Sequence, residues 1–185
     1  QTITLVAAVD GTYTVPANVT TLNVGVPTFQ DEVYESLETF GLTATSISPS
    51  VVNGAIGATG IGTINDEDGP NSDKPIIAIS VAPPTVDEDG ATNLTYTVGI
   101  ANGKTSAFDT TVTFTLTGTA AEGTDYASVT KTVTIPAGQT SVNFVVDPTD
   151  DQVFEGKETV VATLASAATN GVVLGLSPTA SVATG

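Results

Sequence analysis

Three acidic segments in the second half of the chain carry residues that could bind a metal ion. They read VDEDG at 86–90, GTDY at 123–126 and DDQVFEGKE at 150–158. Carboxylates that are crowded together repel one another unless a cation neutralises them. Oxygen ligands without His or Cys favour calcium, magnesium or manganese over zinc or copper. Magnesium requires a tighter octahedron, so these loops favour calcium, with simply solvated acids as the alternative.

The last acidic segment has a counterpart near the start of the chain. A shift of 120 residues superposes four pairs of identical residues: Asp31 and Asp151, Val33 and Val153, Glu35 and Glu155, Glu38 and Glu158. The spacing D-x-V-x-E-x-x-E therefore occurs twice. Self-similarity at a fixed distance indicates repeated units, and a shift of this length corresponds to a whole domain.

The composition excludes several classes of protein. The chain has 20 acidic residues, four lysines and no Arg, and its net charge of −16 argues against nucleic acid and anionic membrane surfaces as partners. It also has no His and no Cys, which removes the commonest general base, thiolate metal sites and disulfides. No segment approaches 18 consecutive apolar residues, so we expect no membrane insertion. Loop acids without His, Arg or Trp platforms predict that the protein is not an enzyme.

Alternation of apolar and polar residues predicts an all-β protein with almost no helix. In the first part of the chain we expect strands at 2–6, 12–15, 21–26, 39–44 and 58–64. In the second part we expect seven strands, at 76–81, 93–100, 110–116, 129–135, 141–146, 159–166 and 179–184. Seven short strands at this spacing predict an immunoglobulin-like β-sandwich, whose loops gather at its two ends. The three acidic loops can then reach the same end.

We predict tandem antiparallel sandwiches of this type, with a partial first repeat at 1–69, an acidic, Pro-containing linker at 70–75 and a second repeat at 76–185. The first repeat lacks counterparts of 76–120, about three strands. The chain is then a fragment of a longer protein, which we favour, or the first repeat is a shorter variant, or another chain supplies the missing strands.

Four further residues receive structural roles from the sequence. Asp73 is interpreted as a solvated linker residue, and Asp87 and Asp89 as turn residues. Tyr126 is predicted to anchor its loop in the core.

The order of V-D-E-D-G, G-T-A-A-E-G-T-D-Y, P-A-G-Q-T and D-D-x-V-F-E-G-K-E resembles the Calx-β domain pattern. The resemblance covers 76–185 and part of 1–70. It implies an immunoglobulin-like sandwich that binds calcium at one end. The ligands that it implies in the second repeat are Glu88, Asp125, Asp150, Asp151, the carbonyl of Val153, Glu155 and Glu158.

The family also places an acidic triplet directly after its last strand. The ligands that the resemblance implies in the first repeat are therefore Asp31, the carbonyl of Val33, Glu35, Glu38, Asp66, Glu67 and Asp68. Gln30 stands where the second repeat has Asp150, and the early Glu and the DY aspartate are missing. We expect one ion there rather than a full cluster.

Tandem, Thr- and Val-rich, acidic, Cys-free repeats look like the extender region of large bacterial RTX-type surface adhesins. This similarity implies an extracellular or cell-surface protein in which Ca²⁺ stiffens the loops and the junction between domains. Its partners would be neighbouring repeats, with a host or biofilm ligand bound elsewhere in the protein. The alternatives are a carbohydrate- or protein-binding adhesion module, a subunit that polymerises by strand complementation into an extracellular filament, and an intracellular calcium sensor.

Overall fold

The computed structural model describes residues 2–6, 18–46, 57–66, 72–151, 153–177 and 182–185. The described residues form strands, turns and loops, and none of them is helical. Accordingly, no helix in this part of the chain could cross a membrane. The chain folds into two compact units, an N-terminal unit of Gln1–Asp31 and a C-terminal unit of Glu32–Gly185. The division at 70–75 concerns the sequence repeats and stays a prediction.

The described residues of the N-terminal unit form one pair of strands. Strand β1 (Thr2–Val6) runs parallel to β2 (Thr21–Gly25), with Thr2 opposite Thr21. Both strands lie where the alternation predicts them. The predicted strand at 12–15 lies outside the described residues.

The C-terminal unit begins with a short strand and an antiparallel pair of longer ones. Strand β3 (Val33–Tyr34) pairs in parallel with β8 (Thr105–Ser106). Strand β4 (Glu38–Ala44) pairs with β5 (Ala58–Ile64). Two residues are too few for a period-2 pattern, so the sequence did not predict β3 or β8.

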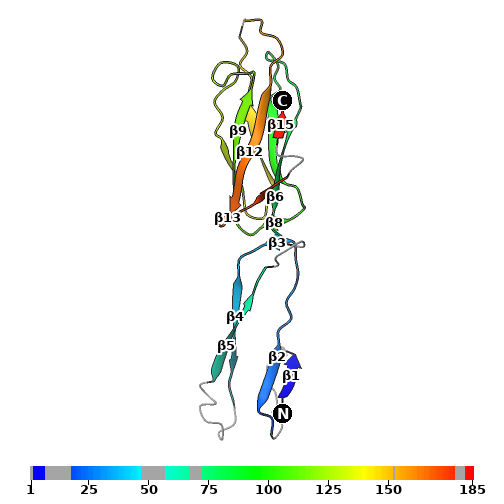
Figure 1. Ribbon diagram of the computed structural model, residues 1–185, viewed down its shortest axis with the longest axis vertical. Coiled ribbons are helices and arrows are strands. Elements are labelled where there is room, and N and C mark those ends of the chain that lie inside the picture. Colours follow the sequence, from blue (N-terminus) through cyan, green and yellow to red (C-terminus); the bar gives the residue numbers. More distant parts are fainter. Residues whose placement is uncertain (1, 7–17, 47–56, 67–71, 152, 178–181) are drawn as a thin grey trace. The chain divides into compact units, whose positions relative to one another are not determined.

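The rest of the C-terminal unit is a sandwich of two sheets (Figure 1). One sheet has the order β11-β7-β6-β14, formed by Ser141–Val146, Leu94–Ile100, Ile76–Ala82 and Gly175–Leu176. The other has the order β10-β9-β12-β13, with β15 also paired to β12, formed by Thr132–Ile135, Thr110–Gly118, Val160–Thr169, Val172–Val173 and Val182–Thr184. The predicted all-β, immunoglobulin-like sandwich is confirmed.

Alternate residues of these strands form the core. On β7, Leu94, Tyr96 and Val98 are buried, and their neighbours are more exposed. On β12 the register shifts between Leu164 and Ser166. This bulge lets even-numbered residues before it and odd-numbered residues after it face the same core. Among the described residues, the members of the hydrophobic core cluster lie between 77 and 183, so the second repeat has its own core.

Aromatic stacking joins the two sheets. Phe144 on β11 lies 4.9 Å from Tyr96 and 4.2 Å from Phe114, measured between ring centroids. The hydroxyl of Tyr96 donates a 2.6 Å hydrogen bond to the carbonyl of Val160, at the start of β12. The start of β12, next to the acidic loop, is therefore fixed from the core.

The interpretation of Asp73 as a solvated residue is wrong. Asp73 is only 1% exposed, and its carboxylate accepts a 2.6 Å hydrogen bond from the ammonium of Lys104. Lys104 also pairs with Glu32. A carboxylate can be buried when a charged donor satisfies it, and the sequence could not show which lysine would do so.

Candidate metal centre

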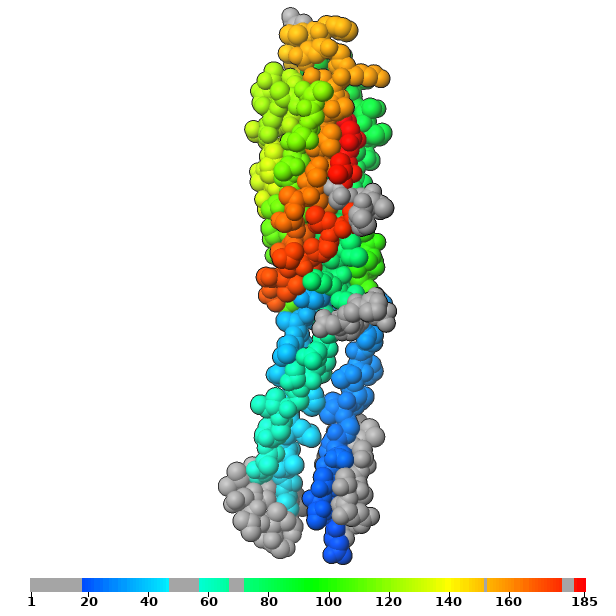
Figure 2. All heavy atoms as spheres, viewed as in Figure 1, coloured from blue at the N-terminus to red at the C-terminus, as the bar shows by residue number. Residues whose placement is uncertain are grey.

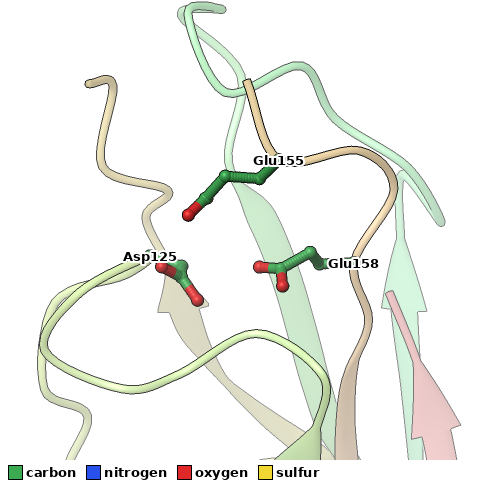
Figure 3. Close-up of side chains that lie close together, drawn as sticks. All are labelled: Asp125, Glu155 and Glu158. Carbon is green, nitrogen blue, oxygen red and sulfur yellow. The ribbon is translucent and has the colours of Figure 1, made fainter. Parts of the chain in front are cut away.

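Two loops at one end of the sandwich bring three carboxylates together. Asp125 lies in the loop between β9 and β10, and Glu155 and Glu158 lie in the loop between β11 and β12. One oxygen from each of the three lies within 4.8 Å of the others. The three side chains point toward one another (Figure 3). We refer to them as the carboxylate triad.

Asp125 is held in place by its own loop and by the core. The next residue, Tyr126, is buried, as the sequence predicted. The Asp125 side chain accepts a 2.5 Å hydrogen bond from the backbone N–H of Ala121. The backbone carbonyl of Asp125 accepts a 2.9 Å hydrogen bond from the N–H of Thr149, which directly precedes the acidic loop at 150–158. The two loops are thus linked through the backbone at Asp125.

Glu158 is positioned by the start of β12. The N–H of Thr159 donates to the hydroxyl of Thr119 at 2.9 Å, and the carbonyl of Thr159 accepts from Ala120 at 3.2 Å. This close approach requires glycine at 118, where φ is +137° and a Cβ would lie 1.9 Å from the Thr159 oxygen. Glu158 is therefore held beside the loop that carries Asp125.

Figure 2 shows the loop at 150–151 and 153–158 exposed at the end of the sandwich, in yellow to orange. A cavity of about 510 Å³ opens beside this loop. Its wall includes the triad and also Asp87, Glu88 and Asp89 from the loop after β6. All three acidic loops therefore reach one end, as the topology argument predicted.

Asp87 and Asp89 were predicted only as turn residues. The turn is present, because the N–H of Gly90 donates to the carbonyl of Asp87 at 3.0 Å. Both aspartates nevertheless line the cavity. The available signal was their position on either side of Glu88, within one loop.

Electrostatics in the cavity favour a neutralising partner. Lost hydration, followed by repulsion from Asp151 and Glu155, raises the pKa of Glu88. Lost hydration and the charge of Asp125 raise the pKa of Glu158. Raised pKa values mean that the anionic forms are destabilised by their surroundings. A bound cation would reverse that effect.

The donor set fits calcium. Calcium–oxygen distances of 2.3–2.6 Å place ligand oxygens on opposite sides of the ion about 5 Å apart. The three carboxylate oxygens lie within that span. Glu155 and Glu158 are exposed and Asp125 is partly exposed, so water can complete the six to eight ligands that calcium takes. Among the described residues, this is the group of acids whose oxygens converge closely enough for one ion.

The other predicted ligands of the second repeat lie near the triad. Asp150 and Asp151 are close enough for their charges to raise the pKa of Glu88. The Asp151 carboxylate accepts a 2.6 Å hydrogen bond from the N–H of Val153. None of these three residues lines the cavity, and their assignment as ligands stays a prediction.

The predicted site of the first repeat is described only in part. The N–H of Glu35 donates to the Asp66 carboxylate at 3.2 Å, which brings the segments on both sides of the β4–β5 pair together. Glu38 is exposed at the start of β4, and Val33 lies in β3. Asp31 belongs to the N-terminal unit. Glu67 and Asp68 lie outside the described residues, so this site stays a prediction.

Comparison with known proteins gave similarities to a domain family and to solved structures. The model of the Calx-beta domain matches residues 7–68 and 71–184. Among solved structures, the chain is similar to one titled "Crystal structure of Apo-form Calx CBD1 domain", with 24% sequence identity and a TM-score of 0.42. That match covers 59% of this chain and 95% of the other. A search of curated proteins found no match.

Proposed function

Because the chain belongs to the Calx-beta family of calcium-binding β domains, we propose that it is a calcium-binding extender of a secreted or cell-surface bacterial adhesin. The observation that carries the proposal is the carboxylate triad, whose members come from two different loops. An ion held by Asp125, Glu155 and Glu158 would connect these loops at one end of the sandwich. The predicted ligands Asp150, Asp151 and Glu88 lie close enough to add charge to the same centre.

Bound calcium would supply the positive charge that this end of the protein lacks. Asp125 presents a side chain already ordered by the Ala121 N–H, and the two glutamates extend from the loop between β11 and β12. Binding would therefore order the glutamate loop against the fixed aspartate. An extender needs stiff ends, because it must hold neighbouring domains at fixed positions relative to one another.

The composition supports the remaining parts of the proposal. A net charge of −16 suits a soluble, calcium-loaded extracellular protein and disfavours nucleic acid as a partner. We propose neighbouring repeats as the partners, a location outside the cell or on its surface, and no catalytic activity and no membrane insertion. The ligand of the adhesin would bind elsewhere in the protein.

Exposed aromatic residues weigh against a carbohydrate-binding module. In the described residues, the exposed aromatic side chains are Phe29 and Phe154, and they belong to different compact units. Sugar-binding surfaces usually present aromatic side chains with convergent polar groups. The scarcity of exposed aromatic side chains among the described residues therefore favours the extender over the carbohydrate-binding module.

Polymerisation by strand complementation is a second candidate, favoured by one observation. Within the part of the chain that is described, β4 pairs only with β5. Its counterpart in the second repeat, β12, pairs with β9 on one edge and with β15 on the other. A strand edge of this kind could accept a strand from another chain. Sedimentation velocity over a range of concentrations tests this candidate, because a complemented filament would grow with concentration.

Thermal unfolding with calcium, magnesium or chelator tests the calcium-binding extender. A calcium-specific rise in Tm is expected, since a ligand that binds only the folded state stabilises it by mass action. Small-angle scattering should then show a narrower range of dimensions in calcium than in chelator. Equal Tm values in all three solutions would contradict the proposal and leave the acids as solvated loop residues.

A further inference from the structure

A short stretch before β4 is docked on the loop that follows β7. Val33 and Tyr34 pair in parallel with Thr105 and Ser106. The N–H of Thr105 donates to the carbonyl of Glu32 at 3.1 Å, and the N–H of Ala107 donates to the carbonyl of Tyr34 at 2.9 Å. The loop after β7 thus offers a strand edge, and the stretch before β4 occupies it.

Charged and polar contacts surround this strand pair. Lys104 bonds to buried Asp73 at 2.6 Å and pairs with Glu32 on the docked stretch. Asn102 donates to the carbonyl of Lys74 at 3.0 Å and accepts from the N–H of Ile76 at 3.3 Å. The residues at 102–106 therefore form an acceptor surface, ordered by the segment that leads into β6.

The docked stretch has a counterpart whose side chains are exposed. The shift of 120 residues places Val33 on Val153 and Tyr34 on Phe154. Val33 and Tyr34 are both partly buried. Val153 is 60% exposed and Phe154 is 98% exposed. An apolar pair at the tip of an otherwise acidic loop is costly to leave in water, and its counterpart shows what covers such a pair.

We propose that Val153 and Phe154 form a docking strand for a further copy of the second repeat, which receives them on its Thr105–Ser106 edge. The contact would repeat the pairing of β3 with β8. The docking strand and the acceptor edge are different surfaces, so the contact is head-to-tail and extends into linear rows. The inference rests on the tandem-repeat part of the proposed function and not on its calcium chemistry.

A charged position differs between the two stretches and predicts a difference in the strength of docking. Glu32, which pairs with Lys104, is replaced at the shifted position by Gln152. Lys104 of the receiving copy would keep its bond to Asp73 but would lack the second carboxylate. Docking through Val153 and Phe154 is therefore weaker than the β3–β8 pairing, and Gln152→Glu strengthens it.

Disulfide trapping in a tandem protein tests the inference. The full chain is followed by a second copy of residues 66–185, which has its own core and its own acceptor edge. Because the chain has no native Cys, pairs can be introduced singly. The test pair is Val153→Cys with Thr105→Cys in the second copy. The reference pair is Val33→Cys with Thr105→Cys in the first copy. The control pair is Val145→Cys, at an exposed position on β11, with Thr105→Cys in the second copy.

Disulfide formation in a glutathione buffer is then followed by gel mobility. Neighbouring strands lie about 4.8 Å apart, within the range that a disulfide bridges. The reference and test pairs should form disulfides about tenfold faster than the control pair, because docking raises the effective concentration of the two thiols. Phe154→Asp should slow the test pair without affecting the reference pair, and Gln152→Glu should accelerate it.

Two outcomes would overturn the inference. The first is fast disulfide formation in the reference pair together with a test pair that reacts only as fast as the control pair. This result would show that Val153 and Phe154 do not dock. A reference pair that matches the control would remove the β3–β8 pairing on which the inference is built. The Tm of the same tandem protein in calcium and in chelator reports calcium binding separately, so a failure of docking is distinguishable from a failure of the calcium site.

Discussion

Replacing Asp125 by Asn should abolish calcium-dependent stabilisation and leave the calcium-free protein folded. The triad joins two loops, and Asp125 is its one contribution from the β9–β10 loop. Asn keeps an oxygen that can accept the hydrogen bond from the N–H of Ala121, so the loop retains its local structure. Only the charge and one ligand oxygen are lost.

The size of the effect follows from mass action. At a free calcium concentration about 100 times the dissociation constant, binding adds about 2.7 kcal/mol to the free energy of unfolding. For a unit of about 150 residues, this corresponds to a rise of about 8 °C in Tm. The Asp125→Asn protein should show a rise close to zero at the same calcium concentration, while its Tm in chelator equals or exceeds that of the wild type because a repulsive charge is gone.

Differential scanning calorimetry in calcium and in chelator measures both quantities. Asp147→Asn is the matched control, since it removes one exposed acid outside the triad and should keep the calcium-dependent rise. Asp125→Ala separates the hydrogen bond from the charge, because it should lower the Tm in chelator as well. A full calcium-dependent rise in Asp125→Asn would refute the assignment of the triad as the binding centre.

Three other predictions concern Gly118, the ion pair of Lys104 and the titration of Glu158. Gly118→Ala should lower the free energy of unfolding by about 3 kcal/mol in urea titrations, because its Cβ would lie 1.9 Å from the Thr159 oxygen at a φ of +137°. Lys104→Met should lower the Tm in calcium and in chelator alike, because it leaves the Asp73 carboxylate buried without its cation; a Tm equal to the wild type would contradict this role. The raised pKa of Glu158 stabilises the calcium-free folded protein below pH 4.5, and this contribution is lost as the pH rises through the folded pKa; calcium binding should release protons, which calorimetry in buffers of different ionisation enthalpy would detect.

The long strands of the sandwich were predictable because each buries one face. β7, β9 and β11 lie within one or two residues of the ranges predicted from alternation. β10 begins at Thr132 rather than at 129, because Lys131 and the N–H of Val129 bond to Glu122 and keep this segment in the preceding loop. Such a bond depends on where a distant carboxylate lies, and alternation carries no information on that.

The candidate centre was predictable as a set of loops but not as a set of atoms. The topology argument brought three acidic loops to one end, and the structure places them there. Which carboxylates converge depends on the hydrogen bonds that fix Asp125 and on the close approach at Gly118. Asp73 could not be predicted for the same reason. It is buried because the fold places the ammonium of Lys104 against its carboxylate.

The lysines that form ion pairs in this protein lie away from the carboxylate triad. In the described parts of the chain, the ion pairs join Lys104 to Asp73 and Glu32, and Lys131 to Glu122. The first two pairs lie where β3 docks on β8, and the third lies at the base of the β9–β10 loop. Among the described residues, the triad has no such pair. Two of the four lysines thus fasten strands and loops, and the crowded carboxylates of the triad are the ones for which we propose a divalent ion. Calcium would then control the end of the sandwich, while the junction at Lys104 holds with or without it.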